Sequence, residues 1–279
     1  MARENTGPDF IEALARGLDV IRSFGDHHRP MSLSEIASGA ALARPTARRI
    51  LLTLEQLGYV RSGDAGFTLT PRVLELGVAY TLSAGMWDIA LPYLHDLVRA
   101  TNQAASVAVL DGSDIIYVAR AAVPKVVSAN ITVGMRLPAR STALGKVLLS
   151  ALDADRLAEV LAIPSASVTR PFREQPLENL HAELREIRAR GWAATNEEMT
   201  PGVRSIAAPV RDGDAVVVAA VNLSAISAEV THEQMTKDFP PLVLLAAGEI
   251  GDNHALVRAV PQAVVRGGAG PGGRGSGRS

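Results

Sequence analysis

Apolar residues recur at helical spacing in three consecutive segments near the start of the chain, at 9–25, 32–40 and 44–57. The repeat in the first segment consists of Ile11, Leu14, Leu18 and Ile21. The second segment opens with a capping box, because Ser32 is followed three positions later by Glu35. After the third segment the period changes to two on either side of a glycine-containing turn. This part of the chain therefore predicts three helices followed by a β-hairpin.

The third helical segment separates its residues by face. Its apolar side is formed by Ala47, Ile50, Leu51 and Leu54. Polar residues occupy the rest of the helix surface, namely Arg44, Thr46, Arg48, Arg49, Thr53 and Gln56. We expect the apolar side to pack into a core and the polar side to face outward.

The rest of the chain mixes strand and helix patterns and indicates an α+β protein. Short strands and helices alternate from about residue 101 to residue 256. The last segment is rich in glycine and lacks an apolar set, so we expect it to be disordered. The expected divisions are a first domain over 9–71, a linker helix over 72–85, a second domain over 86–257 and a tail over 258–279.

Composition narrows the classes of function. Hydrophobic residues make up 47% of the chain, and no apolar run reaches the roughly 20 residues of a membrane span. Neither a membrane contact nor a signal peptide is expected, which predicts a cytoplasmic protein. The chain has no cysteine and its six histidines form no metal-binding pair, so we expect no metal site and no cofactor. Because the net charge is only −1, any DNA contact must come from a local basic surface.

The order of elements in the first domain predicts a winged helix-turn-helix. In this arrangement a helix about 10–12 Å across enters the major groove of duplex DNA, and the hairpin reaches the neighbouring backbone. The candidate DNA-binding residues are Arg44, Thr46, Arg48, Arg49, Thr53 and Arg61. Several arginines on one helix are, taken alone, typical of an ordinary solvated face. The order of helix, helix and hairpin favours binding of double-stranded operator DNA instead.

The sequence also resembles the isocitrate lyase regulator (IclR) family of bacterial transcription factors, over roughly residues 9–256. The resemblance is carried by segments such as RPTARRILLTLEQLGYV, VGMRLPARSTALGKVLLS and GVRSIAAPVRDGDAVVVAAVNLS. PRVLELG, YVAR and RSIAAPV are most similar to the branch that regulates aromatic-acid catabolism. The resemblance implies a GAF-like effector domain with an antiparallel sheet and flanking helices. It also implies homodimers that often pair into tetramers, and operators upstream of catabolic genes.

The second domain offers a binding site for a small organic acid. A helix that begins near Ser141 would present free backbone N–H groups and a positive dipole end to a carboxylate. The resemblance places in the family's pocket Met135, Ala143, Leu144, Ser205, Asn222 and Ser224. Further candidates nearby are Tyr117, Arg136, Arg140, Ser141 and Thr142. Arg140 and Ser205 depart from the residues common in the family, which leaves the identity of the acid open. Each candidate also has an ordinary alternative role, such as helix cap or core filler.

The alternative interpretation is a small-molecule-binding or hydrolytic enzyme with a structural helical N-terminal domain. Glu197 and Glu198 could form an acid–base pair, although adjacent carboxylates in a loop are usually solvated. Ser205 has no evident His partner, and Gly145-Lys146 lacks the flanking residues of a phosphate-binding loop. We therefore assign no catalytic residue. The sequence predicts a ligand-responsive, sequence-specific transcription regulator, in which the effector shifts the balance between two arrangements of the DNA-binding domains.

Overall fold

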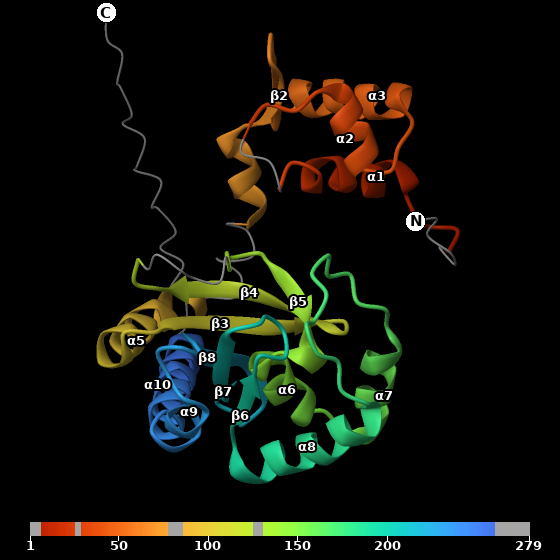
Figure 1. Cartoon of the computed structure of the whole chain (residues 1–279). Helices are drawn as coiled ribbons and strands as arrows, with labels where there is room; N and C mark the ends of the chain where they lie inside the picture. The colour runs from red at the N-terminus through yellow and green to blue at the C-terminus, as the bar shows by residue number, and fades with distance from the viewer. Residues whose placement is uncertain (1–6, 26–28, 78–85, 125–130, 260–279) are drawn as a thin grey trace, which may run out of the picture. The chain divides into compact units, whose positions relative to one another are not determined.

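The computed structural model describes residues 7–25, 29–77, 86–124 and 131–259, and the chain divides into two compact units between Ala84 and Gly85 (Figure 1). Of the linker helix expected over 72–85, only the start is described: a 3₁₀ turn, η1 (Pro71–Val73), followed by helical residues up to Gly77. The remainder of this segment and the end of the chain beyond residue 259 lie outside the described residues. No helix in the described ranges combines the length and the apolarity that crossing a membrane requires.

The first unit contains the expected three helices and hairpin. They are α1 (Glu12–Arg22), α2 (Leu33–Gly39), α3 (Arg44–Gln56), β1 (Val60–Gly63) and β2 (Gly66–Leu69). The predicted capping box is present at α2, since the Ser32 hydroxyl accepts from the Glu35 amide (3.3 Å) and the Glu35 carboxylate accepts from the Ser32 amide (2.8 Å). Hydrogen bonds from Arg29 and then from Ser32 lower the pKa of Glu35 to about 2. The carboxylate therefore stays charged throughout the neutral range.

The core of the first unit lies where the helices meet the hairpin. Ile36, Leu51 and Val60 are among its buried members. Met31, just before α2, exchanges two backbone hydrogen bonds of 2.9 and 2.8 Å with Phe67 of β2. The hairpin is thereby joined to the start of α2, and the predicted winged helix-turn-helix is confirmed.

Only some of the apolar residues of α1 face this core. Val20 and Phe24 are buried, whereas Ile11, Leu14 and Leu18 are 65%, 63% and 42% exposed. The helical period was predicted correctly, but a period alone does not tell which of two apolar faces the core uses. α1 therefore carries one apolar face in the core and a second one on the surface of the unit.

The second unit is built on a six-stranded antiparallel sheet with the strand order β5-β4-β3-β8-β7-β6. The strands are β3 (Ala104–Asp111), β4 (Asp114–Ala121), β5 (Arg136–Pro138), β6 (Ala193–Asn196), β7 (Val203–Arg211) and β8 (Val217–Ile226). The helices are α5 (Met86–Thr101), the 3₁₀ turn η2 (Ala139–Ser141), α6 (Ala143–Ser150), α7 (Ala154–Ala162), α8 (Leu177–Arg190), α9 (His232–Lys237) and α10 (Pro240–Ala259). The expected α+β class is confirmed. The likeness to GAF domains stays a prediction.

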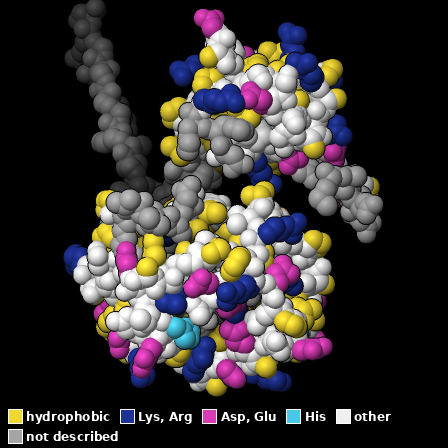
Figure 2. All heavy atoms as spheres, viewed as in Figure 1, with side chains coloured by type: hydrophobic (Ala, Val, Ile, Leu, Met, Phe, Trp, Pro, Cys, Tyr) yellow, Lys and Arg dark blue, Asp and Glu magenta, His cyan; other side chains and the backbone are white. Residues whose placement is uncertain are grey.

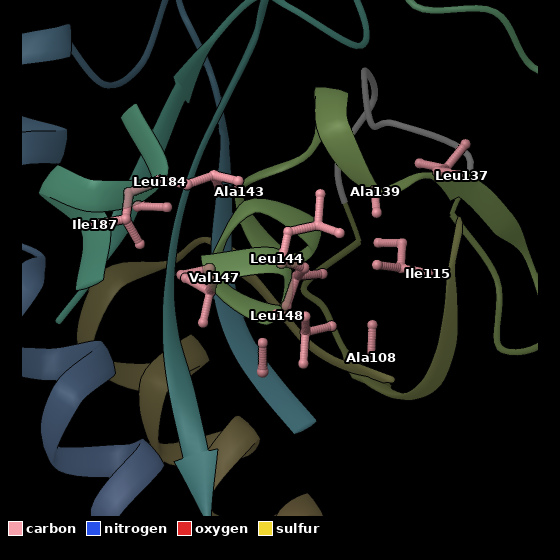
Figure 3. Packing of buried hydrophobic residues seen from close by; sticks show 14 of the residues in the cluster. Ala108, Ile115, Leu137, Ala139, Ala143, Leu144, Val147, Leu148, Leu184 and Ile187 are labelled. Carbon is pink, nitrogen blue, oxygen red and sulfur yellow. The ribbon is translucent and has the colours of Figure 1, made fainter. Parts of the chain in front are cut away.

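Helices cover both faces of the sheet. α5 packs on β3 and β4, α10 packs on β7 and β8, and the two helices contact each other on this face. On the other face α6 contacts β3, β6, β7 and β8, and α8 lies against α6 (Figure 1). Leu144, Val147 and Leu148 of α6 join Leu184 and Ile187 of α8 in the main hydrophobic cluster (Figure 3).

The position of α6 depends on a glycine in its first turn. All residues of α6 are buried, and the backbone of η2 lies directly against the helix. A Cβ atom on Gly145 would lie 2.1 Å from the carbonyl oxygen of Ala139. Only glycine permits two backbone segments to approach so closely.

We expect Gly145→Ala to destabilise the second unit by about 1–3 kcal/mol, because the new methyl group must push the backbone of Ala139 away from α6. Gly248→Ala is the matched control, since a Cβ at this exposed position of α10 meets nothing within 4 Å. The control substitution should stabilise the protein by about 0.5–1 kcal/mol, which is the usual gain in stability when alanine replaces glycine inside a helix. Urea denaturation followed by circular dichroism measures both effects. Equal stability of the two variants would contradict the close approach.

Candidate functional site

The first candidate site is the outer side of α3. Arg44, Arg48 and Arg49 are exposed there, while Ala47 and Leu51 on the inner side are completely buried. None of the three arginines forms an ion pair with the residues that the structure describes. Their guanidinium groups are therefore available to an anionic partner such as a phosphate backbone.

The hairpin is held against the end of α3. The carboxylate of Glu55 accepts hydrogen bonds from the Ser62 hydroxyl and from the Ser62 amide, the latter at 2.9 Å. These two bonds hold the pKa of Glu55 below its usual value. Arg61 lies exposed on the adjacent position of β1. On α3 itself, the hydroxyl of Thr53 donates to the carbonyl of Arg49 (3.0 Å). The wing thus presents Arg61 at a fixed place relative to the arginines of α3.

An apolar groove of about 890 Å³ runs between α1 and α3. Its lining includes the exposed side chains of Leu14 and Leu18, together with Leu76 beyond the hairpin. Arg49 and the half-buried Thr46 border the same groove. Figure 2 shows hydrophobic side chains among basic ones on the visible face of this unit. An exposed apolar surface of this kind is typical of a protein–protein contact.

The second candidate site is a small cavity on the α6 face of the sheet. Its volume is about 40 Å³, room for about three water molecules. It is lined by Tyr117, Ile131, Leu137, Thr142, Ala143, Leu144, Thr195, Met199, Thr200, Val203, Ser205, Asn222 and Ser224. None of these described residues carries a formal charge. Hydroxyl and amide groups provide the polar part of the wall, and aliphatic and aromatic side chains provide the rest.

A cluster of neutral polar side chains lies on β7 and β8. Strand pairing places Ser205 opposite Ser224, and their hydroxyl oxygens are 2.6 Å apart. Asn222, two positions earlier on β8, donates from Nδ2 to Ser224 Oγ (2.9 Å). The Oδ1 atom of Asn222 is buried and accepts no hydrogen bond from the described residues. An unsatisfied buried acceptor of this kind is unfavourable in a folded protein.

The first turn of α6 forms another part of the wall. The hydroxyl of Thr142 accepts from the Gly145 amide (3.0 Å), and the carbonyl of Thr142 accepts from the Lys146 amide (2.9 Å). The amides of Ala143 and Leu144 precede these positions and have no partner within the helix. Both residues line the cavity, so the positive end of the helix dipole faces it.

Lys146 is a buried cation on the same helix. Its side chain is 1% exposed, and its Nζ lies 2.8 Å from a Glu183 oxygen and 2.7 Å from a Glu198 oxygen. Burial raises the pKa of Glu198, and the positive charge of Lys146 partly offsets that effect. These ion pairs connect α6 to α8 and to the loop that carries Met199 and Thr200 into the cavity wall.

The residues considered for enzyme chemistry have structural partners. Glu198 pairs with Lys146, whereas Glu197 accepts from the Gly202 amide (3.0 Å) and lies 3.9 Å from Arg204. The hydroxyl of Ser205 pairs with another serine, not with a histidine. In the described part of the chain, no group of three or more His, Asp or Glu residues could hold a metal ion.

Both units match known family models. Residues 13–64 match the IclR helix-turn-helix domain, and residues 78–251 match the C-terminal domain of bacterial IclR transcriptional regulators. The chain belongs to the IclR family. It is a ligand-responsive, DNA-binding transcription regulator with the two-part organisation that the sequence predicts.

Two relatives of the chain in the IclR family are named as regulators. The Pca regulon regulatory protein of Pseudomonas putida is 38% identical over 246 residues, 87% of this chain and 84% of that protein. The p-hydroxybenzoate hydroxylase transcriptional activator of Acinetobacter baylyi is 30% identical over 87% of this chain and 91% of its own length. An IclR homolog from Microbacterium hydrocarbonoxydans, crystallised with 4-hydroxybenzoate, shares the fold with a TM-score of 0.74 at 23% identity, over 88% of this chain and 99% of that one. The two curated relatives are regulators, not enzymes.

The residues predicted for the IclR effector site fall into two groups. Those that line the cavity are Tyr117, Thr142, Ala143, Leu144, Ser205, Asn222 and Ser224. Those that lie outside its lining are Met135, which packs against the core cluster, Arg136, Arg140 and the buried Ser141. Arg136 forms ion pairs with Asp111 and Asp114, and Arg140 lies 2.6 Å from Glu174. Both arginines therefore already have carboxylate partners.

Arg120 is a basic residue near the IclR-type cavity that the sequence reasoning missed. It is half-buried, donates from Nη1 to the Ser106 hydroxyl (3.0 Å) and forms no ion pair with the described residues. Ser106 is paired with Arg120 on one side and with Asn222 on the other, so the three side chains share one face of the sheet. Burial raises the pKa of Tyr117 to about 12, partly offset by the charge of Arg120. The phenol of Tyr117 is therefore protonated at neutral pH.

Proposed function

We propose that this IclR-family protein controls an operon for aromatic-acid catabolism. In this proposal α3 binds double-stranded operator DNA, and the cavity beside α6 binds a small aromatic acid as the effector. The observation that carries the proposal is the uncharged cavity, which joins the free amides at the start of α6 to a polar cluster on the strands. A role on chromosomal DNA favours a cytoplasmic location.

A benzoate-type acid fits the chemistry of this cavity. Its carboxylate can accept hydrogen bonds from the amides of Ala143 and Leu144 at the positive end of the helix dipole. Its ring can contact Tyr117 and Met199, which lie in the same lining. Arg120 adds positive potential on the same face of the sheet. The names of relatives that refer to p-hydroxybenzoate and 4-hydroxybenzoate support an aromatic acid.

Filling the cavity tests the effector assignment. We expect Ser205→Phe to abolish the heat of binding of 4-hydroxybenzoate in isothermal titration calorimetry, because the new ring occupies the space that the ligand needs. Val168→Phe is the matched control, since Val168 is 88% exposed and lies outside the lining. Operator binding by both variants verifies that they are folded. Unchanged heat in Ser205→Phe would place the effector elsewhere.

The surface of α3 suits the major groove of DNA. Arginine side chains can donate hydrogen bonds to guanine edges or to phosphates. We infer contacts with guanine edges for Arg48 and Arg49. For Arg44 and Arg61 we infer contacts with phosphates. The hydroxyl groups of Thr46 and Thr53 flank the same side of the helix. Ala47 and Leu51 anchor the opposite side in the core, which keeps this surface turned outward.

We expect Arg49→Ala to weaken binding to the operator by about 1–3 kcal/mol and to relax one base preference, because one base contact is lost. Gel-shift titration on the promoter beside the protein's own gene measures the change at fixed salt concentration. Arg99→Ala removes the same charge from an exposed position of α5 and should leave the affinity unchanged. Equal affinity of wild type and Arg49→Ala would refute the role of this residue.

We further infer that the protein is a homodimer, in which the groove between α1 and α3 receives α1 of a second copy. Leu14 and Leu18 expose apolar side chains there, and an exposed apolar patch of this kind is typically covered in a protein–protein contact. A two-fold dimer presents two copies of α3 to half-sites about 34–36 Å apart, which matches a palindromic operator. Pairing of two such dimers would give a tetramer.

Leu18→Glu tests this interface. Charge placed in the groove should halve the mass of the particle measured by light scattering, because two buried glutamates cannot be accommodated in an apolar contact. Val168→Glu introduces the same charge at an exposed position of the second unit and should leave the mass unchanged. A Leu18→Glu protein of wild-type mass would exclude the groove as the dimer contact.

A further inference from the structure

The wall of the effector cavity consists of parts that are held with different firmness. β7 and β8 are each paired along both edges, and α6 is buried along its whole length. Another part of the wall comes from the loop over 197–202 between β6 and β7, which contributes Met199 and Thr200. Met199 is half-buried and Thr200 is exposed, so this loop lies between the cavity and solvent.

The cavity is too small for the acid that we assign to it. Its volume of about 40 Å³ has room for about three water molecules, and an aromatic acid is several times larger. Part of the wall must therefore move outward when the effector binds. The loop over 197–202 is suited to this movement, because the exposed Thr200 borders solvent and can move without disturbing a packed core.

An ion pair ties this loop to α6. A carboxylate oxygen of Glu198 lies 2.7 Å from the Nζ atom of Lys146. The same Nζ atom lies 2.8 Å from Glu183 of α8, whose carboxylate also accepts from Gln175 Nε2 (2.7 Å). The two carboxylates that neutralise Lys146 therefore come from different elements. One belongs to a helix that packs on α6, and the other belongs to the loop.

This double pairing makes the contact with the loop reversible. A buried cation that loses its only partner is strongly unfavourable. When the loop moves outward, Lys146 loses Glu198 but keeps Glu183, so its charge stays paired. In the inward arrangement the carboxylate of Glu198 is itself penalised, since burial raises its pKa. Lys146 can therefore release Glu198 without leaving a charge unpaired in the interior.

The backbone at the ends of the loop opposes the inward arrangement. Glu197 has a φ of +58° and Gly202 a φ of +73°. Glycine adopts this left-handed conformation readily, whereas it is strained for a residue such as Glu197. The contact between Glu198 and Lys146 must offset this strain.

The segment beside the loop can follow an outward movement. The amides of Phe172 and Arg173 donate to the carbonyls of Met199 (3.2 Å) and Glu198 (2.9 Å), so segment and loop are joined. Phe172 and Arg173 are both exposed. The ion pair of Arg140 with the next residue, Glu174, lies at the surface, where such pairs contribute little stability.

We propose that the ion pair of Lys146 with Glu198 is a latch on the effector cavity, which holds the loop over 197–202 inward in the ligand-free protein and breaks when the effector enters. Glu198 is thus a positioning residue that acts through the loop. Glu183 is the partner that Lys146 keeps in both arrangements. This inference rests on the proposed function of the cavity as the effector site.

The two partners of Lys146 should affect effector binding in opposite directions. We expect Glu198→Gln to bind 4-hydroxybenzoate about 3- to 30-fold more tightly than wild type, because the outward arrangement is then more populated before the ligand arrives. Loss of a whole charge-assisted hydrogen bond corresponds to about 10- to 100-fold, and glutamine keeps part of it. Glu183→Gln should weaken binding by a similar factor, since release of Glu198 then leaves Lys146 without a carboxylate.

Isothermal titration calorimetry on the full-length protein measures these affinities, and circular dichroism verifies that the variants are folded. Glu159→Gln is the control, since it removes the same charge from an exposed position of α7 and should leave the affinity unchanged. A purely architectural role of the ion pairs would weaken binding in both Lys146-partner variants. Weaker or unchanged binding by Glu198→Gln would therefore overturn the latch.

Hydrogen exchange without ligand separates this inference from the proposed function. The amides of Glu197, Gly202 and Val203 form hydrogen bonds within the loop and at its ends. They should exchange about 3- to 30-fold faster in Glu198→Gln than in wild type, while amides within α6 keep their rates. Equal exchange in both proteins would overturn the latch, whichever ligand binds. Faster exchange without binding of 4-hydroxybenzoate by any variant would support the latch and overturn the aromatic effector.

Discussion

The burial of α6 against one face of the antiparallel sheet is the constraint on which the effector site depends. When a helix is buried on all sides, neighbouring backbone segments must be able to pack closely against it. Any charged side chain that it carries also needs a partner of opposite charge. Gly145 provides the first, because the backbone of η2 fits against the helix there. Glu183 and Glu198 provide the second for Lys146. With its sides filled, α6 has only its N-terminal amides left to offer, and Ala143 and Leu144 present them to the cavity.

The polar groups around this helix divide into two sets with different tasks. The charged groups, from Arg136 and Arg140 to Lys146, are neutralised by carboxylates and contribute to the architecture. The cavity lining holds neutral groups, and one of them, the Asn222 oxygen, lacks a partner among the described residues. An acid bound here meets helix amides and no carboxylate in the lining, so its negative charge is not opposed. Binding chemistry is thus separated from the ion pairs that hold the fold together.

Local patterns predicted the first unit well, because its elements are set by nearby residues. The capping box of α2 and the two faces of α3 need only spacings of three and four to be recognised. The ion pairs of Arg136 with Asp114 and of Arg140 with Glu174 could not be predicted from local spacing, because the partners lie far apart in the sequence. Arg120 was missed for another reason. Strict alternation puts it on the opposite face from Tyr117, but a β-bulge beside Val107 and Ala108 shifts the register and brings both to one face.

The volume of the cavity links recognition to conformational change. Sites for small organic ligands commonly measure about 300–1,000 Å³, whereas this cavity measures about 40 Å³. An aromatic acid therefore binds only if part of the lining moves outward. α6 is buried along its whole length and resists such a shift, while Met199 and Thr200 belong to a loop held by the contact between Glu198 and Lys146. A ligand that binds the widened arrangement more tightly raises the population of that arrangement, up to a factor equal to the ratio of its affinities for the two arrangements. Regulation of DNA binding by the effector needs a difference of this kind.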